Sequence, residues 1–468
     1  MKFFRFGNKN KSGENIYFIF WIIFSSCKAR HDRVSKVFEC LLGGTCQMWQ
    51  SMRSVASLLL SFGLLLLANG MFGTLLGLRS KLEGFSTETV GFVMAGYFFG
   101  LLLGATHAVR VVAAVGHIRG FAAFASIMSV AVLSHVLWID PWIWLILRII
   151  AGFCMAGMVM VVESWLNERA TNDTRGRILS IYMMINYLGA GIGQFMITAA
   201  DPAKYQLFVI ASIIFSIALV PVLLTRSRAP NPGSSKRMNL RDMYGVSPLG
   251  VIGTICAGMV NSSIGGMGPV FAKDSGLSVF GVSTFMACMI TSGMVLQFPI
   301  GRLSDRYNRR TILLIVALLT ALAALAVIWA TGQAPIWLFV TGVFFGSFCY
   351  TVYPLCAAQI NDLADPGRLV QVSAGLLFAY GVGASVGPIV ASQMMGRFGP
   401  EGMFISSAAL AGSLALFTVY RMLRRDRSDK SKSTFVPLGG AGVSGKQLYV
   451  ATLKSLLRRR KSEPKSRA

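Results

Sequence analysis

The sequence predicts an all-α membrane protein with 12 transmembrane helices in two pseudo-symmetric six-helix bundles. Three observations predict this fold. Only 13% of the 468 residues are charged, about half of the roughly 25% typical of soluble domains. Twelve segments stay apolar for about 20 residues, the length that crosses a bilayer. Features of the first six segments recur in the last six. This composition excludes a soluble enzyme, a disordered scaffold and a disulfide-stapled secreted domain.

The spans fall into two sets of six that are separated by a polar connection. Residues 225–247, which contain two prolines and several basic residues, form this predicted linker. The first set makes an N-terminal bundle over residues 54–224 and the second a C-terminal bundle over residues 248–421. The predicted spans are residues 54–78, 89–112, 120–139, 141–165, 177–199, 204–224, 248–270, 281–300, 310–331, 335–358, 369–393 and 400–421.

The basic residues orient the spans. When basic residues at the span ends are counted with the adjoining connection or tail, the connections on one side hold 15 Lys and Arg residues and those on the other side hold 5. The two tails add 9 and 14 to the first side. Because Lys and Arg concentrate on the cytoplasmic side, both termini are predicted to be cytoplasmic, in a multi-pass protein of the cytoplasmic (inner) membrane. The net charge of +25 is therefore assigned to this face, and no nucleic-acid partner is expected.

Both tails leave alternatives open. Residues 1–53 form an amino-terminal extension whose apolar run, Ile16–Phe24, is too short to cross a bilayer. It is either a non-native upstream extension, with Met48 or Met52 as the true start, or an interfacial anchor. Residues 422–468 form a basic cytoplasmic tail. Apolar residues at helical spacing within it favour a helix on anionic lipid, and an unstructured tail is the alternative.

An internal repeat relates the two bundles. Asn69 in span 1 matches Asn261 in span 7, an offset of 192 residues, and Gly116 matches Asn308 at the same offset. Two six-span repeats in the same orientation are one architecture of secondary transporters, with the substrate site near the bilayer midplane between them. The sequence therefore predicts a solute site that both halves line.

The connection after span 8 carries the most specific motif. Residues 301–310 read Gly-Arg-Leu-Ser-Asp-Arg-Tyr-Asn-Arg-Arg, which resembles the loop motif of the major facilitator superfamily. Asn308 replaces the second glycine of that motif, which is a mild departure because asparagine is the non-glycine residue best able to hold a left-handed backbone. The first-half equivalent has lost the pattern, with Ala113 and Ala114 in place of Asp and Arg. The segments around 148–152, 162–165, 353–355 and 381–388 are similar to the YcaD-like branch of the superfamily.

This resemblance implies a gate built from charged residues near the cytoplasmic surface. The motif aspartate, Asp305, is expected to latch onto the amino terminus of span 5 near Gly176, where helix N–H groups attract an anion. Two further pairs are expected, Arg306 with Asp362 and Glu163 with Arg175, and solvated salt bridges are the alternative. The full predicted gate set is Gly301, Asp305, Arg306, Arg309, Arg310, Glu163, Arg175 and Asp362.

Arg148 lies seven residues into span 4, and a charge at membrane depth is a functional candidate by default. It is read as an anion-binding or proton-coupling cation, with an arginine tied to backbone carbonyls as the alternative. Other polar residues share helix faces by their spacing and are predicted to line the cavity or to form packed interhelical hydrogen bonds. The complete predicted cavity set is Asn69, Arg148, Tyr182, Asn186, Asn261, Tyr350 and Tyr353.

These features favour a secondary transporter of a small solute that works by alternating access, with proton coupling left open. The central parts of spans 1, 5, 7, 10 and 11 hold no Asp or Glu, so carboxylate-based proton coupling would run through Glu163 or through a site near the cytoplasmic rim. A neutral, amphipathic or anionic solute fits better than a cation. No metal-ligand set, nucleotide-binding motif or nucleophile pair occurs, so no enzyme, metal or cofactor is expected. The expected partners are the solute and membrane lipid, with the chain as a monomer. The alternative is a non-transporting receptor or assembly factor on the same fold.

Overall fold

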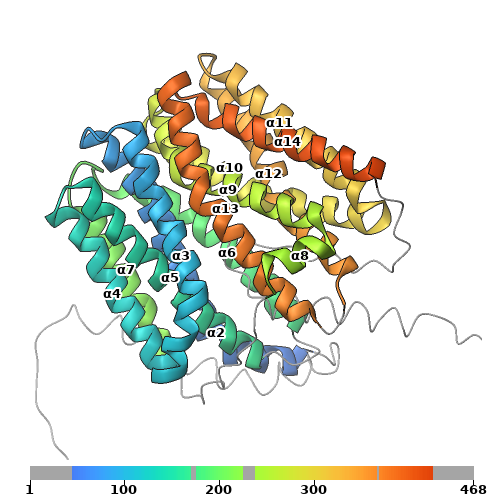
Figure 1. The fold of residues 1–468 in the computed structure, drawn as a ribbon. Helices are drawn as coiled ribbons and strands as arrows, with labels where there is room; N and C mark the ends of the chain where they lie inside the picture. Colours follow the sequence, from blue (N-terminus) through green and yellow to red (C-terminus); the bar gives the residue numbers. More distant parts are fainter. Residues whose placement is uncertain (1–44, 170–174, 225–237, 366–367, 425–468) are drawn as a thin grey trace, which may run out of the picture. The chain divides into compact units, whose positions relative to one another are not determined.

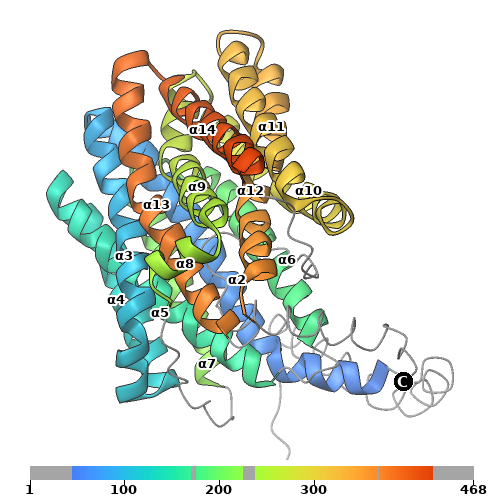
Figure 2. The same cartoon turned by 45° about the vertical axis from the view of Figure 1, so that its right-hand side comes forward.

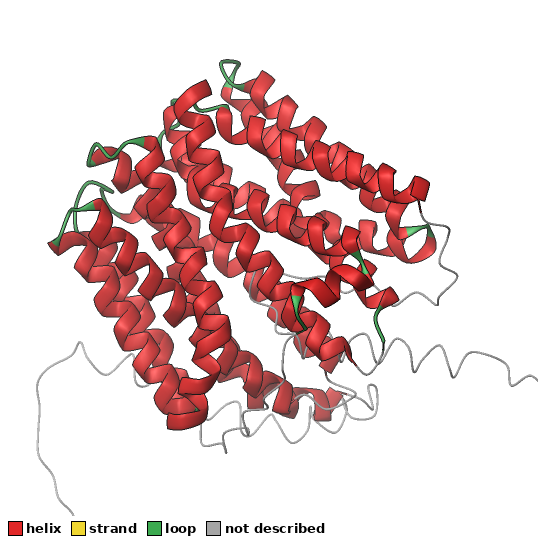
Figure 3. Cartoon of the chain, in the orientation of Figure 1, coloured by secondary structure: helices red, strands yellow, loops and turns green. Residues whose placement is uncertain are grey.

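The computed structural model describes residues 45–169, 175–224, 238–365 and 368–424, and these residues form only helices and loops (Figure 3). Side chains of residues 45–55, 175–177 and 370 lie outside the description. The elements are α2 (Thr45–Leu82), α3 (Thr87–Val115), α4 (His117–Leu137), α5 (Pro141–Arg169), α6 (Arg175–Phe195), the 3₁₀ turn η1 (Met196–Ala199), α7 (Gln206–Leu223), α8 (Leu240–Val246), α9 (Pro248–Asp274), α10 (Val279–Arg306), α11 (Arg309–Ala330), α12 (Pro335–Leu363), α13 (Leu369–Phe398) and α14 (Gly402–Arg424).

Twelve helices within the described ranges are long and apolar enough to cross a membrane, which confirms the predicted number of spans. Helices α2 to α7 form the N-terminal half and α9 to α14 the C-terminal half. Outer helices expose large apolar side chains, among them Leu137 of α4 at 70% and Leu416 of α14 at 73%. Apolar exposure of this extent suits a surface that lipid covers.

The helices within each half pack as neighbours along much of their length. Helix α3 packs on α5 and α4 on α7, and in the other half α11 packs on α14 and α12 on α10 (Figures 1 and 2). Glycines allow the closest approaches: a Cβ atom on Gly152 of α5 would overlap the backbone carbonyl oxygen of Tyr97 on α3. Small residues at such crossings let helix backbones meet in membranes.

Short polar caps set several helix boundaries. The hydroxyls of Ser86, Ser247 and Ser278 each accept a hydrogen bond from the backbone N–H three residues on, at the start of α3, α9 and α10. Asn308 does not use the left-handed backbone that asparagine can hold. Its φ is −62°, and its side chain caps α11 by accepting from the Arg310 N–H at 3.0 Å. Its repeat partner Gly116 has a φ of +88°, so the symmetric turns differ because only glycine takes that backbone without steric cost.

Chain connectivity gives the bundle two faces. We call the face where α10 ends and α11 begins the motif face, and the face where α2 ends and α3 begins the far face. Because the described spans are even in number, the first span begins and the last span ends at the motif face. The described part of the linker lies at this face, where the Met238 N–H donates to the Gln371 carbonyl of α13 at 3.1 Å.

Among the described residues, the halves meet where α3 packs on α13 and α6 on α10, and specific contacts join them at the far face. Lys81 of α2 pairs with Asp274 of α9 at 3.2 Å, and the rings of Phe195 and Phe280 lie 6.1 Å apart. Deeper in the bundle, Gln297 of α10 bonds to a side chain of α6. The halves are therefore joined directly at the far face. The predicted tail segments 1–44 and 425–468 lie outside the described residues.

Candidate functional site

The buried arginine of α5 stands among aromatic rings. Arg148 is only 3% exposed, and its Cζ lies 4.4 Å from the ring centroid of Tyr97 and 5.7 Å from that of Phe72. Its buried Nε has no hydrogen-bond partner among the described residues. Within the described residues no backbone carbonyl accepts from this nitrogen.

Neighbouring polar groups extend this cluster. The Tyr97 hydroxyl donates to Asn69 Oδ1 at 2.9 Å, which places Asn69 beside the arginine's aromatic partner. His135 of α4 packs edge-on against Phe72, with ring centroids 5.3 Å apart, and its Nδ1 lies 2.7 Å from the Ala131 carbonyl. Helices α2, α3, α4 and α5 all contribute, so the cluster belongs to the N-terminal half.

The carboxylate of α5 occupies a second buried position. Glu163 is 3% exposed and accepts a hydrogen bond of 2.6 Å from the Tyr182 hydroxyl. The Tyr182 ring stacks on Phe62 of α2 at a centroid distance of 4.3 Å. Tyr182 is thus held by helices of its own half, while Asn186, one turn on, is partly buried. The predicted partner Arg175 has a side chain outside the description, so that pairing stays a prediction.

A polar group also bridges the two halves. Gln297 Nε2 of α10 donates to the Tyr187 hydroxyl of α6 at 2.8 Å and to the Tyr350 carbonyl of α12 at 3.1 Å. One turn further along α12, the ring of Tyr353 packs against Tyr380 of α13 at 4.9 Å between centroids. Tyr350 and Tyr353 therefore lie near the boundary between the halves.

The repeat-related asparagines differ in their bonding. Asn69 bonds to Tyr97 as above, whereas Asn261 of α9 is 7% exposed and its Oδ1 has no hydrogen-bond partner within the described ranges. Sequence reasoning missed Tyr97, Tyr187 and Gln297. A search for uncharged polar residues in the middle of spans would have found Gln297, whereas nothing in the spacing distinguishes the two tyrosines.

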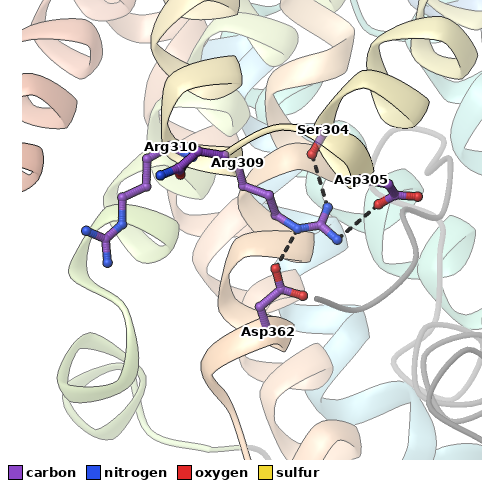
Figure 4. Close-up of polar contacts among 6 residues, drawn as sticks. Ser304, Asp305, Arg309, Arg310 and Asp362 are labelled. Carbon is purple, nitrogen blue, oxygen red and sulfur yellow. Dashed lines mark hydrogen bonds and ion pairs between the residues drawn. The ribbon is translucent and has the colours of Figure 1, made fainter. Parts of the chain in front are cut away.

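The loop motif forms an ion-pair network around one arginine. Arg309, whose side chain is 1% exposed, places Nε 2.6 Å from Asp362 Oδ2 of α12 and Nη2 3.1 Å from Asp305 Oδ1 (Figure 4). A third bond runs from Nη1 to the Ser304 hydroxyl at 3.1 Å. One guanidinium thus ties α10, α11 and α12 together at the motif face.

This network corrects one predicted pair. The guanidinium that contacts Asp362 is that of Arg309, because Arg309 begins α11 and is buried, whereas Arg306 ends α10 with an exposed side chain. Gly301 lies within α10, and the Arg310 side chain points away from the network (Figure 4). The latch of Asp305 onto the start of α6 stays a prediction, because side chains 175–177 lie outside the description.

Comparison with known proteins assigns the family. The model of the Major Facilitator Superfamily matches residues 58–329 and 250–461. The chain belongs to the major facilitator superfamily. An uncharacterized MFS-type transporter of Enterobacter sp. (strain 638) is 31% identical over 77% of this chain and 93% of the relative. The MFS-type transporter YcaD of Escherichia fergusonii is 29% identical over the same shares, which confirms the YcaD-like resemblance.

Solved structures of this superfamily share the fold. The nucleoside transporter NupG superposes with a TM-score of 0.68 at 13% identity, covering 80% of this chain and all of NupG. The D-xylose-proton symporter gives a TM-score of 0.58 at 17% identity, covering 78% of this chain and 96% of the symporter. Major facilitator proteins are transporters that bind small-molecule solutes, so this chain is a multi-pass membrane transporter and not an enzyme.

Proposed function

We propose that this superfamily member is a secondary active transporter that moves a small solute across the cytoplasmic (inner) membrane by alternating access. The observation that supports the mechanism is that the described residues join the halves at the far face, through Lys81 with Asp274 and Phe195 with Phe280, and deeper in the bundle through Gln297 with Tyr187. A bundle joined at one face can open at the other when one half rocks against its partner. The protein is proposed to act as a monomer.

The Lys and Arg distribution supports a cytoplasmic motif face with both termini inside. In that orientation the conformer described above is closed toward the outside. The proposed domain bounds are residues 54–224 and 248–421 for the halves, 225–247 for the linker, 1–53 for the extension and 422–468 for a basic tail on anionic lipid. The charged network around Arg309 then lies on the cytoplasmic side, where the proposed gate operates.

Proton coupling, where it occurs, is assigned to Glu163. This carboxylate is buried and accepts a hydrogen bond from the Tyr182 hydroxyl. A buried carboxylate that changes protonation as the halves separate couples a proton to the conformational cycle. Substitution Glu163→Gln is expected to abolish proton movement in proteoliposomes while solute counterflow continues.

A designed disulfide tests alternating access. A Cβ atom on Gly191 of α6 would lie 2.8 Å from Cγ2 of Thr291 of α10. The two Cβ atoms are therefore about 4 Å apart, within the range of a disulfide. In a background without other cysteines, oxidation of Gly191→Cys with Thr291→Cys is expected to hold the far face closed and to stop transport, and reduction is expected to restore it.

The matched control places a disulfide within one half. A Cβ atom on Gly253 would lie 3.7 Å from Cβ of Cys356, and both residues belong to the C-terminal half. Gly253→Cys, with only Cys356 retained, is expected to cross-link without stopping transport. Full transport by the oxidised pair between halves contradicts the rocking mechanism.

A receptor or assembly factor is the second candidate, and the lost motif at Ala113 and Ala114 favours it. Reconstituted counterflow separates the two functions. Counterflow of a solute across the bilayer supports the transporter, whereas ligand binding without any flux supports the receptor.

A further inference from the structure

The Arg148 guanidinium is held in place without being neutralised. It is 3% exposed and flanked by Tyr97 and Phe72, and its Nε has no hydrogen-bond partner among the described residues. Burying a charge without a partner costs free energy, because the charge loses its hydration and no opposite charge or hydrogen-bond acceptor replaces it. A site that holds a cation in this way is incomplete until an anion enters it.

The described part of the chain offers no carboxylate to complete it. Among these residues, no acidic side chain lies within ion-pair distance of Arg148. The carboxylate on the same helix, Glu163, is 15 residues away along the sequence, about 22 Å at the helical rise. Arg148 is therefore too far from Glu163 for the two to neutralise each other.

The rings of Tyr97 and Phe72 satisfy none of the hydrogen-bond donors of the guanidinium, and its buried Nε has no partner among the described residues. Stacking on a ring occupies the flat face of an arginine, while Nε–H and the adjacent Nη–H point outward in one plane. This pair of donors matches the two oxygens of a carboxylate. A phosphate, with a charge of about −1.5 to −2 near neutral pH, would leave excess negative charge beside this single cation. The donor geometry and the charge both favour a carboxylate.

The cluster borders the boundary between the halves. Asn69, bonded to Tyr97, is partly exposed. Phe98, the next residue after Tyr97, faces α9, where a Cβ atom on Gly265 would lie 3.7 Å from its ring. Asn261, one turn before Gly265 on α9, keeps its buried Oδ1 without a partner in the described segments. A ligand at this boundary would meet a cation on one side and a hydrogen-bond acceptor on the other.

We propose that Arg148 binds a carboxylate group of the transported solute, with Tyr97 and Phe72 orienting the guanidinium and Asn261 accepting a hydrogen bond from the rest of the solute. This deepens the proposed function and rests on it. The substrate class is an organic carboxylate that also carries a hydrogen-bond donor, such as a hydroxy or amino acid.

Thermal unfolding of the purified full-length protein tests the anion site without any flux. The probes are sodium acetate, sodium lactate and sodium phosphate, each compared with sodium chloride at equal ionic strength, and lactamide as the uncharged counterpart of lactate. Lactate and acetate are expected to raise the unfolding temperature above chloride, and phosphate and lactamide are not. In Arg148→Met the carboxylate effect is expected to vanish, with affinity at least about tenfold weaker, and in Arg148→Lys to survive in part.

The matched control is Arg424→Met, because Arg424 also stacks on a ring, that of Tyr420 at 5.0 Å, but is exposed at the end of α14. It is expected to keep the wild-type carboxylate response. Ligand-free Arg148→Met is expected to unfold no lower than this control, since an unneutralised buried charge has been removed.

Three results would overturn the inference. They are a rise in unfolding temperature with carboxylate that is no larger than with chloride, a carboxylate-dependent rise that persists in Arg148→Met, and a clear loss of stability in ligand-free Arg148→Met. Failure of the inference is separable from that of the transport proposal. If carboxylates bind in a way that depends on Arg148 but no counterflow occurs, the transport proposal alone is overturned. If a neutral solute undergoes counterflow and that counterflow is unchanged in Arg148→Met, the inference alone is overturned.

Discussion

Gln297 of α10 donates a hydrogen bond of 2.8 Å to the hydroxyl of Tyr187 of α6, across the boundary between the two halves. The same amide donates to the Tyr350 carbonyl of α12. One side chain therefore connects the halves and also fixes a helix of its own half. The bond to the Tyr187 hydroxyl is buried and the bond to the Tyr350 carbonyl is part-buried.

Replacing Gln297 with leucine is expected to open the far face more often. The change removes both hydrogen bonds of Gln297, each with a net contribution of about 0.5–1.5 kcal/mol, from the conformer closed at that face. The measurement is the alkylation rate of a single cysteine at position 291, which should rise. Tyr187→Phe combined with Gln297→Leu should recover part of the effect, and an unchanged alkylation rate would contradict the role of this bond.

Arg309→Met is expected to destabilise the fold strongly. The substitution removes the cation from between two carboxylates, and breaking a buried ion pair costs about 3–5 kcal/mol. Thermal unfolding of the purified protein measures the loss. Arg306→Met is the matched control: its side chain is exposed, so a change within about 0.5 kcal/mol is expected. Equal losses in the two variants would show that Asp362 depends on Arg306 as well.

Substitutions of the two acidic partners of Arg309 should separate an effect on stability from an effect on gating. Asp305 has a side chain 25% exposed and Asp362 one 11% exposed. Asp305→Asn is therefore expected to lower stability less than Asp362→Asn, because the more buried pair survives. Counterflow and labelling at position 291 should nevertheless change in Asp305→Asn. If both stay at wild-type values, Asp305 does not latch the halves.

The contact between α3 and α5 is expected to reject even one methyl group. Gly152→Ala would overlap the Tyr97 carbonyl oxygen, and since that atom belongs to a helix backbone, overpacking should cost about 1–3 kcal/mol. Gly73→Ala in α2 is the matched control, as nothing lies within 4 Å of its added Cβ. That substitution should be neutral or stabilise by about 0.5–1 kcal/mol through helix propensity. Unfolding temperatures compare the two.

The same substitution should weaken the response to carboxylates. Tyr97 supplies both the carbonyl oxygen that the added methyl group would overlap and the ring over Arg148. A shift of the Tyr97 backbone therefore displaces this ring from the guanidinium. Lactate is expected to stabilise Gly152→Ala less than it stabilises wild type, while Gly73→Ala responds normally. If lactate stabilises Gly152→Ala as much as wild type, carboxylate binding at Arg148 tolerates movement of α3.

The sequence by itself determined the number of spans, the parallel repeat and the family, because hydropathy, length and a contiguous loop motif are properties of residues close together in the chain. It also singled out Arg148, since an arginine among apolar residues is conspicuous without any structure. Tertiary structure alone decided the partners. Asp362 contacts Arg309 and not Arg306, because burial depends on which helix carries each guanidinium and how that helix is rotated. Tyr182 bonds Glu163, and Tyr97 covers Arg148, for the same reason: a side chain's neighbours on other helices are fixed by packing in three dimensions, which spacing along one helix does not encode.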